Sequence, residues 1–294
     1  ACFGFDSVVG NYASPETPGS AYVLLHHVFG EVEGEKGAWG HALGGMGSIT
    51  QIMKSVCENM GVEITTNASV NKILVQNNSA TGVLLEDGSK ILSKKVISNL
   101  NPKLLFKNLV NHDDVDKEYL RKILHYKCGS GTFRMNVALS ELPNFKCLPS
   151  SGVSDHHKSG IIFAPTLSYM DKAFTDAKKF GWSKNPIVEM LIPSTVDSSL
   201  APEGKHVASL FCQQFAPNLP NNRSWHDERE NAASTIINTV NKFAPNFKES
   251  IIGSSILSPL DLEEKLGLLG GDIMHGVMSL DQMWAARPVF NYGD

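Results

Sequence analysis

The chain has 294 residues, of which 42% are hydrophobic, and this length favours two domains at roughly 150 residues per domain. It carries 26 basic and 30 acidic residues, a formal net charge of −4, so it lacks the overall positive charge that nonspecific binding to nucleic acids or anionic membranes requires. The composition excludes collagenous and largely disordered chains, and no stretch of 18 apolar residues is present to span a membrane.

The first half of the sequence predicts one helix followed by short strands. Residues 1–40 are rich in Gly, Pro and aromatic residues and are predicted to be irregular. After the glycines at 44–47, apolar residues recur at helical spacing, so we expect a helix with Ser48 as its N-cap and Gly61 at its end. Alternating residues then predict strands, with turns at 77–78 and 87–88, at these positions: 63–65, 73–75, 83–85, from 91, and 96–98.

The second half of the sequence predicts a second sheet with longer helices. Strands are expected at 133–139, 161–164, 187–192, 207–215 and 251–257. Helices are expected from about Asp114, from Ser168 as a cap, over 225–243 with Ser224 as a cap, and after Ser258-Pro259.

The cysteines and histidines give no sign of a metal site. The five cysteines are odd in number and never form a CxxC pair, which argues against a disulfide framework and a cysteine-ligated zinc site. The pairs His26-His27 and His156-His157 chelate poorly, because adjacent side chains on a strand point to opposite faces. We therefore expect no metal and a reducing compartment, the cytoplasm for a bacterial protein or the mitochondrial matrix for a eukaryotic relative.

The nucleotide and nucleophile motifs are incomplete. The segment Gly45-Met46-Gly47-Ser48 lacks the third glycine of GxGxxG and follows no predicted strand, while GxxxxGK[ST] and GxSxG do not occur. Two interpretations of the glycines remain open. They form a flexible turn into a helix, or they let backbone N–H groups approach a cofactor or its pyrophosphate at a helix N-terminus. No catalytic side chain is identified.

Several stretches together resemble one enzyme superfamily over nearly the whole chain. They lie at 44–48, 67–70, 82–88, 96–99, 196–204, 258–276, 279–282 and 287–288. These stretches are similar to the FAD-dependent oxidoreductases of the phytoene desaturase and amine oxidase superfamily. The resemblance implies an α/β (α+β) fold, in which a partial FAD/NAD(P)-binding domain receives an inserted substrate domain built on a mixed or antiparallel sheet flanked by helices.

The resemblance also implies a division of the chain and a set of cofactor contacts. The expected segments are 1–40 in the substrate domain, 41–106 as the middle part of a discontinuous FAD-binding domain, 107–265 as the substrate domain, and 266–294 as a return towards the FAD domain. Gly44, Gly45, Met46 and Gly47 would form the turn beside the flavin, Val70 would hold adenine through its backbone, and Ser98 and Asn99 would end a strand that faces the cofactor.

The implied reaction is hydride transfer from a small apolar or amine-like substrate to FAD. From the residues that follow Ala1 we expect no signal or transit peptide, and the GxGxxG unit and the C-terminal flavin segment of the family do not occur in this sequence. We therefore expect a truncated central fragment that is inactive alone and binds FAD weakly or not at all. Two alternatives are a non-catalytic protein-interaction module on a truncated flavoprotein fold and a hydrolase using His and Asp from 150–230. We expect no nucleic-acid partner and no transmembrane segment; peripheral membrane contact and the oligomeric state stay open.

Overall fold

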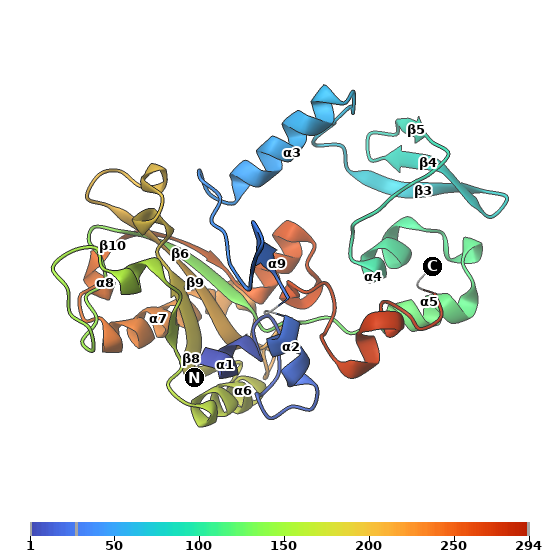
Figure 1. Cartoon of the computed structure of the whole chain (residues 1–294). Helices are drawn as coiled ribbons and strands as arrows, with labels where there is room; N and C mark the ends of the chain where they lie inside the picture. Colours follow the sequence, from blue (N-terminus) through green and yellow to red (C-terminus); the bar gives the residue numbers. More distant parts are fainter. Residues whose placement is uncertain (1, 27–28, 293–294) are drawn as a thin grey trace.

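A five-stranded antiparallel sheet forms the centre of the larger part of the molecule, as seen in the computed structural model, which describes residues 2–26 and 29–292 (Figure 1). The strand order is β10-β6-β9-β8-β7. The bounds are β6 Phe133–Leu139, β7 Ile161–Phe163, β8 Trp182–Leu191, β9 His206–Phe215 and β10 Ile251–Leu257. The predicted second sheet is confirmed, and its all-antiparallel pairing fits an α+β fold flanked by helices.

One face of this sheet packs against α7 (Trp225–Phe243) and contains the main core. Side chains alternate along β6, so that Phe133, Met135, Val137 and Leu139 are buried on this face. They join Trp225, Ile236 and Val240 of α7 in one apolar cluster. The helix begins where predicted, because the Ser224 hydroxyl accepts the N–H of His226.

The opposite face is only partly covered, by α1 (Cys2–Asp6) and α6 (Leu167–Phe180). Their side chains pack with Ile187 and Phe211 in a second cluster over β8 and β9. The predicted cap of α6, Ser168, is wrong. The hydroxyl of Thr166 accepts the N–H of Tyr169, so the helix starts two residues earlier than a Ser168 cap would allow.

The smaller part of the molecule contains α3 (Gly47–Asn59) and a three-stranded meander of β3 (Val70–Gln76), β4 (Ser79–Leu85) and β5 (Lys90–Leu92). The predicted turn at 77–78 is confirmed, since both asparagines have positive φ. The predicted strands at 63–65 and 96–98 are wrong. No strand in the described residues pairs with either segment, and Ile97 is 95% exposed.

The remaining elements are short. They are α2 (Ser20–His26), β1 (Glu31–Val32), β2 (Glu35–Lys36), α4 (Pro102–Leu104), α5 (Lys117–Leu124), α8 (Phe247–Ser250) and α9 (Pro259–Leu266), with a π-turn at Leu105–Leu109 and 3₁₀ turns at His112–Asp114, Asp155–Lys158, Pro193–Thr195, Ser198–Leu200, Leu269–Gly271, Leu280–Gln282 and Trp284–Ala286. The helix predicted from Asp114 starts at Lys117 because the Asp116 carboxylate caps it.

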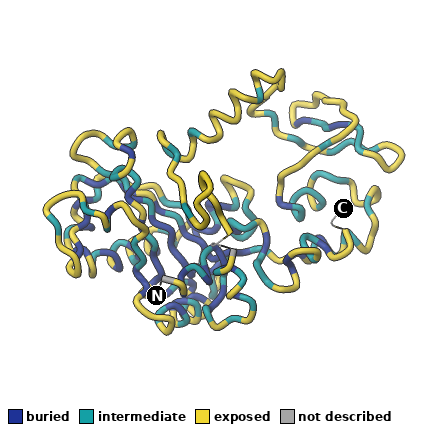
Figure 2. Tube along the Cα trace, in the orientation of Figure 1, coloured by how far each residue is buried: buried dark blue, intermediate teal, exposed yellow. Residues whose placement is uncertain are grey.

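The two parts of the molecule differ in burial, as Figure 2 shows. Buried residues concentrate around the five-stranded sheet, whereas α3 buries none of its residues and β5 is exposed throughout. Asn101 connects the parts, because its side-chain amide donates to Cys128 Sγ at 3.4 Å and to the His275 carbonyl at 3.3 Å. Among the described residues, no helix is both long enough and apolar enough to cross a bilayer.

Candidate functional site

The glycine turn leads directly into α3. Gly44 and Gly45 have φ values of 81° and 84°, a left-handed conformation that glycine adopts without steric cost. The helix then begins at Gly47, with Met46 at the N-cap position and no side-chain cap. Ser48, predicted as the cap, lies in the first turn and donates its hydroxyl to the Gly45 carbonyl at 2.7 Å. That prediction is wrong because the glycines turn the chain into the helix two residues earlier.

The turn leaves backbone donors at the start of α3. Within the described part of the chain, the N–H groups of Met46 and Gly47 have no hydrogen-bond acceptor. A Cβ added at Gly47 would meet open space. Because the N-terminus of a helix carries partial positive charge, these two groups can hold an acceptor atom of a ligand.

Asp197 ties the glycine turn to the sheet. It lies in the loop between β8 and β9, where it accepts the Gly44 N–H at 2.7 Å and the Ser199 hydroxyl at 2.7 Å. His41 Nε2 lies 3.5 Å from the same carboxylate. The hydrogen bonds from Ser199 and Gly44 lower the pKa of Asp197 to about 2, so it is charged at neutral pH. This charge disfavours a phosphate at Gly44, whose N–H already has an acceptor, whereas the N–H groups of Met46 and Gly47 have none among the described residues.

The other predicted cofactor contacts are not joined to this turn. Val70 is the first residue of β3 and pairs with Leu85, and the Ser98 hydroxyl accepts the N–H of Leu100. Ser98 and Asn99 lie in an exposed irregular segment, so the strand end predicted there is wrong. Across the described residues, no hydrogen bond or ion pair links Val70, Ser98 or Asn99 to residues 44–47.

Sequence reasoning missed a partly covered surface of the five-stranded sheet, in which Phe211 is only 8% exposed because it packs against Phe5 of α1. We call it the open face and define it by Arg134 and Asn136 on β6, Ser209 and Phe211 on β9, and Glu189 on β8. Arg134 and Glu189 both pair with Phe211, so the three form one row across the sheet. The only available signal was that polar residues occupy the alternate positions of β6, which does not tell whether a helix covers them.

The open face holds charged side chains that are partly removed from water. Arg134 donates from Nη2 to the Ser209 hydroxyl at 2.9 Å, and its guanidinium carbon lies 5.2 Å from the centroid of the Phe211 ring. Burial lowers the pKa of Arg134 and raises the pKa of Glu189. The positive charge of Arg134 lowers the pKa of Glu189, whereas the negative charge of Asp6 on α1 raises it further.

Comparison with known proteins finds sequence similarity to oxidoreductases. No family model matches the chain. It is 37% identical over 300 residues to pyridine nucleotide-disulfide oxidoreductase domain-containing protein 2 of Rattus norvegicus, covering the whole chain and 52% of that protein. It is 25% identical over 267 residues to phytoene desaturase (lycopene-forming) of Pseudescherichia vulneris, covering 90% of the chain and 50% of that protein. The chain is thus similar in sequence to oxidoreductases that include a phytoene desaturase.

Structural comparison agrees with the predicted fold. An oxidoreductase from Methanosarcina mazei matches with a TM-score of 0.52 and 18% identity, over 74% of this chain and 43% of that one. The α+β fold expected for this superfamily is therefore confirmed. The chain spans about half the length of the curated relatives it matches.

The residues present fit only part of a cofactor site of this superfamily. The free N–H groups of Met46 and Gly47, with open space at Gly47, suit hydrogen-bond acceptors of a cofactor such as FAD. The Asp197 carboxylate at Gly44 does not suit a phosphate. The turn thus fits a cofactor edge and does not by itself form a pyrophosphate site.

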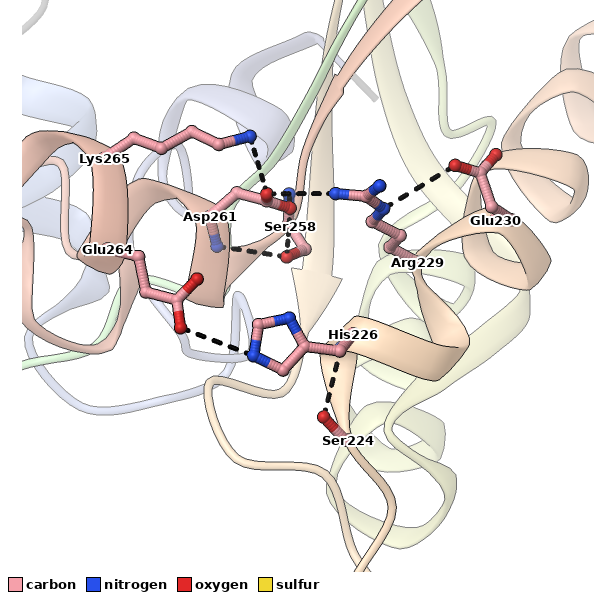
Figure 3. A network of polar contacts seen from close by, with 8 residues as sticks. All are labelled: Ser224, His226, Arg229, Glu230, Ser258, Asp261, Glu264 and Lys265. Carbon is pink, nitrogen blue, oxygen red and sulfur yellow. Dashed lines mark hydrogen bonds and ion pairs between the residues drawn. The ribbon is translucent and has the colours of Figure 1, made fainter.

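A polar network between α7 and α9 has a structural role, as Figure 3 shows. Asp261 accepts from Arg229 at 3.2 Å and from Lys265 at 2.8 Å, and it forms a reciprocal capping box with Ser258 at the start of α9. Arg229, Lys265, Asp261 and Glu230 each have a partner of opposite charge, and His226 Nε2 lies 3.4 Å from the Glu264 carboxylate. The network therefore fixes α9 against α7 and offers no unpaired group to a ligand.

The His156-His157 pair and one cavity lie outside the predicted site. His157 is buried, accepts the Ser154 N–H and lies 3.0 Å from the Pro143 carbonyl, so its role is structural. The pair His26-His27 lies partly outside the described residues. Within the described ranges, no three His, Cys, Asp or Glu residues gather to hold a metal. A cavity of about 510 Å³ beside Phe106, Tyr119 and Tyr292 contains none of the predicted site residues.

Proposed function

We propose that this chain is the central part of an FAD-dependent oxidoreductase that transfers a hydride from a small apolar or amine-like substrate to flavin. The observation that carries the proposal is the alignment of the whole chain, at 37% identity, with an oxidoreductase domain-containing protein about twice as long. When bound, FAD would accept the hydride, and the proton that the substrate also loses would pass to solvent. Relatives named for phytoene and prolycopene support an apolar substrate.

The residues of this chain would position the two reactants. Met46 and Gly47 would donate backbone N–H groups to the cofactor, and Asp197 would hold the turn against the β8–β9 loop. The open face would carry the substrate, because it lies on the sheet that ends at this loop and its neighbour Leu191 is 46% exposed. Phe211 is buried edge-on against Phe5 and would hold the Arg134 guanidinium in place at the edge of this surface.

We further propose that the chain alone binds FAD weakly and is inactive. Two free backbone donors are few for a dinucleotide, and α3 exposes an apolar stripe that a complete domain would cover. The test is the visible flavin absorbance of the purified chain after incubation with FAD and gel filtration. We expect much less than one flavin per chain, and a stoichiometric band would contradict weak binding.

The reading frame around Ala1 and Asp294 tests the wider assignment. A GxGxxG unit between a strand and a helix upstream of Ala1 would support the flavoenzyme. A longer gene product without such a unit would contradict it. The exposed stripe of α3 would then favour the second candidate, a protein-interaction module on a truncated flavoprotein fold. We also propose a reducing compartment, the bacterial cytoplasm or the mitochondrial matrix, because Cys57, Cys128, Cys147 and Cys212 are all unpaired.

A further inference from the structure

We propose that Arg134, with Ser209 and Asn136, recognises the carboxylate of an otherwise apolar substrate on the open face. The proposal rests on the proposed function, because it concerns the substrate of the same site. It replaces the amine-like substrate class with an anionic one.

The first argument is that Arg134 is a poorly paired cation. Its guanidinium has five N–H donors, and the hydrogen bonds among the described residues account for one of them, from Nη2 to the Ser209 hydroxyl. No carboxylate in the described part of the chain forms an ion pair with it. Glu189 interacts with this charge only from beyond ion-pair distance, so a ligand carboxylate that accepts two parallel N–H groups would stabilise the half-buried guanidinium further.

The second argument is that the guanidinium is held in place and its surroundings suit an amphipathic ligand. It lies over the Phe211 ring, which is itself fixed against Phe5. Asn136 is exposed two residues along β6 on the same face and adds an amide donor. Leu257 pairs with Arg134 on β10 and provides apolar surface for the rest of the molecule.

The acidic groups near this position oppose an anion only weakly. Glu189 lies across Phe211 on β8, and Asp6 of α1 interacts with Glu189. One Glu189 oxygen, Oε1, lies 3.5 Å from the position of a Cβ at Gly160, which precedes β7 on the far side of β8 from Arg134. The Glu189 side chain therefore extends away from the guanidinium. Removing its charge should strengthen binding of an anion at Arg134.

The test compares three probes with the same tail and different head groups: octanoate, octanol and octylamine. Their binding to the purified chain is measured by titration calorimetry without flavin, so the result does not depend on the cofactor proposal. We expect octanoate to bind more tightly than the other two. Arg134→Met should weaken octanoate binding by about 10- to 100-fold, as expected for a hydrogen-bonded charge, and leave octanol binding unchanged.

Three further variants make the result specific. Arg134→Lys keeps the charge but not the paired donors, so it should give an intermediate loss and remain testable if Arg134→Met does not fold. Glu189→Gln should tighten octanoate binding several-fold. Lys54→Met on α3, which removes an exposed cation next to the apolar stripe, should change nothing.

Two outcomes would overturn the proposal. Equal binding of octanoate and octanol, with no effect of Arg134→Met, would show adsorption to apolar surface only. If octylamine binds more tightly than octanoate, and Glu189→Gln abolishes this preference, the open face binds an amine. In the second case the oxidoreductase proposal would stand and the anionic substrate class would not.

Discussion

Asp261 carries a charge that the fold depends on, although it takes no part in the candidate site. Burial raises the pKa of Asp261, but hydrogen bonds from Lys265 and Ser258 outweigh this effect and lower the pKa to about 2. Its carboxylate therefore interacts more favourably in the folded chain than in the unfolded one. A carboxylate whose pKa is lowered by folding stabilises the folded chain at pH values above its pKa in the unfolded chain. This stabilisation is lost as the pH falls from about 5 towards 2.

Replacing Asp261 by Asn should lower the free energy of unfolding at pH 7 by about 2 kcal/mol, because the variant keeps the shape of the side chain but not its charge. Urea unfolding at pH 7 and at pH 3 measures this. The wild type should lose stability between the two, and the variant should lose less. Asp155→Asn is the control, since its fully exposed side chain forms one long ion pair with Lys158 at 3.5 Å. Equal pH dependence of Asp261→Asn and the wild type would contradict the assignment.

The helix caps show what could be predicted from the sequence at the scale of single residues. Ser224 and Ser258 cap as predicted, because each directly precedes the first helical residue and no competing cap lies nearby. Ser48 and Ser168 do not, because glycines or Thr166 start the helix earlier. The sequence could not show that Arg134 is poorly paired, since its pairing depends on which side chains of the neighbouring strands lie beside it.

Among the elements, α3 and α7 have similar patterns and opposite environments. Both carry apolar residues at helical spacing, and both were predicted from it. Ile236 of α7 is 0% exposed, whereas Ile52 of α3 is 64% exposed. Periodicity predicts that a helix forms and which of its faces is apolar, but it cannot tell whether this chain supplies the surface that covers it.

The same substitution in the two helices should therefore have different effects. Ile236→Ala should destabilise the chain by about 2–5 kcal/mol, since it removes three carbons from a packed core and leaves a cavity. Ile52→Ala should change the free energy of unfolding by no more than about 0.5 kcal/mol, because its side chain is already in water. Denaturant unfolding of both variants measures the difference. A large loss in Ile52→Ala would show that α3 is covered in solution.

At the scale of the whole molecule, the two parts differ in how many apolar residues they bury. The larger part buries an apolar cluster on each face of its sheet, while the smaller part has β4 at the centre of a meander with only Gly82 and Leu85 classed as buried. The predicted α+β fold is thus confirmed, while the predicted division of the chain into domains stays a prediction. The predicted strands at 63–65 and 96–98 fail because they have no strand to pair with, and apolar composition alone does not make a strand.

Amide hydrogen exchange should divide the chain along this boundary. Peptides from β6 and β9, which are central strands with hydrogen bonds on both sides, should stay protected until the larger part unfolds. Peptides from α3 should exchange within the shortest time measured, because no residue of that helix is buried. Exchange followed by mass spectrometry at two protein concentrations provides the control. If the protection of α3 rises with protein concentration, a second copy of the chain covers its apolar stripe. If α3 is as protected as β6 at both protein concentrations, the helix is covered within one chain.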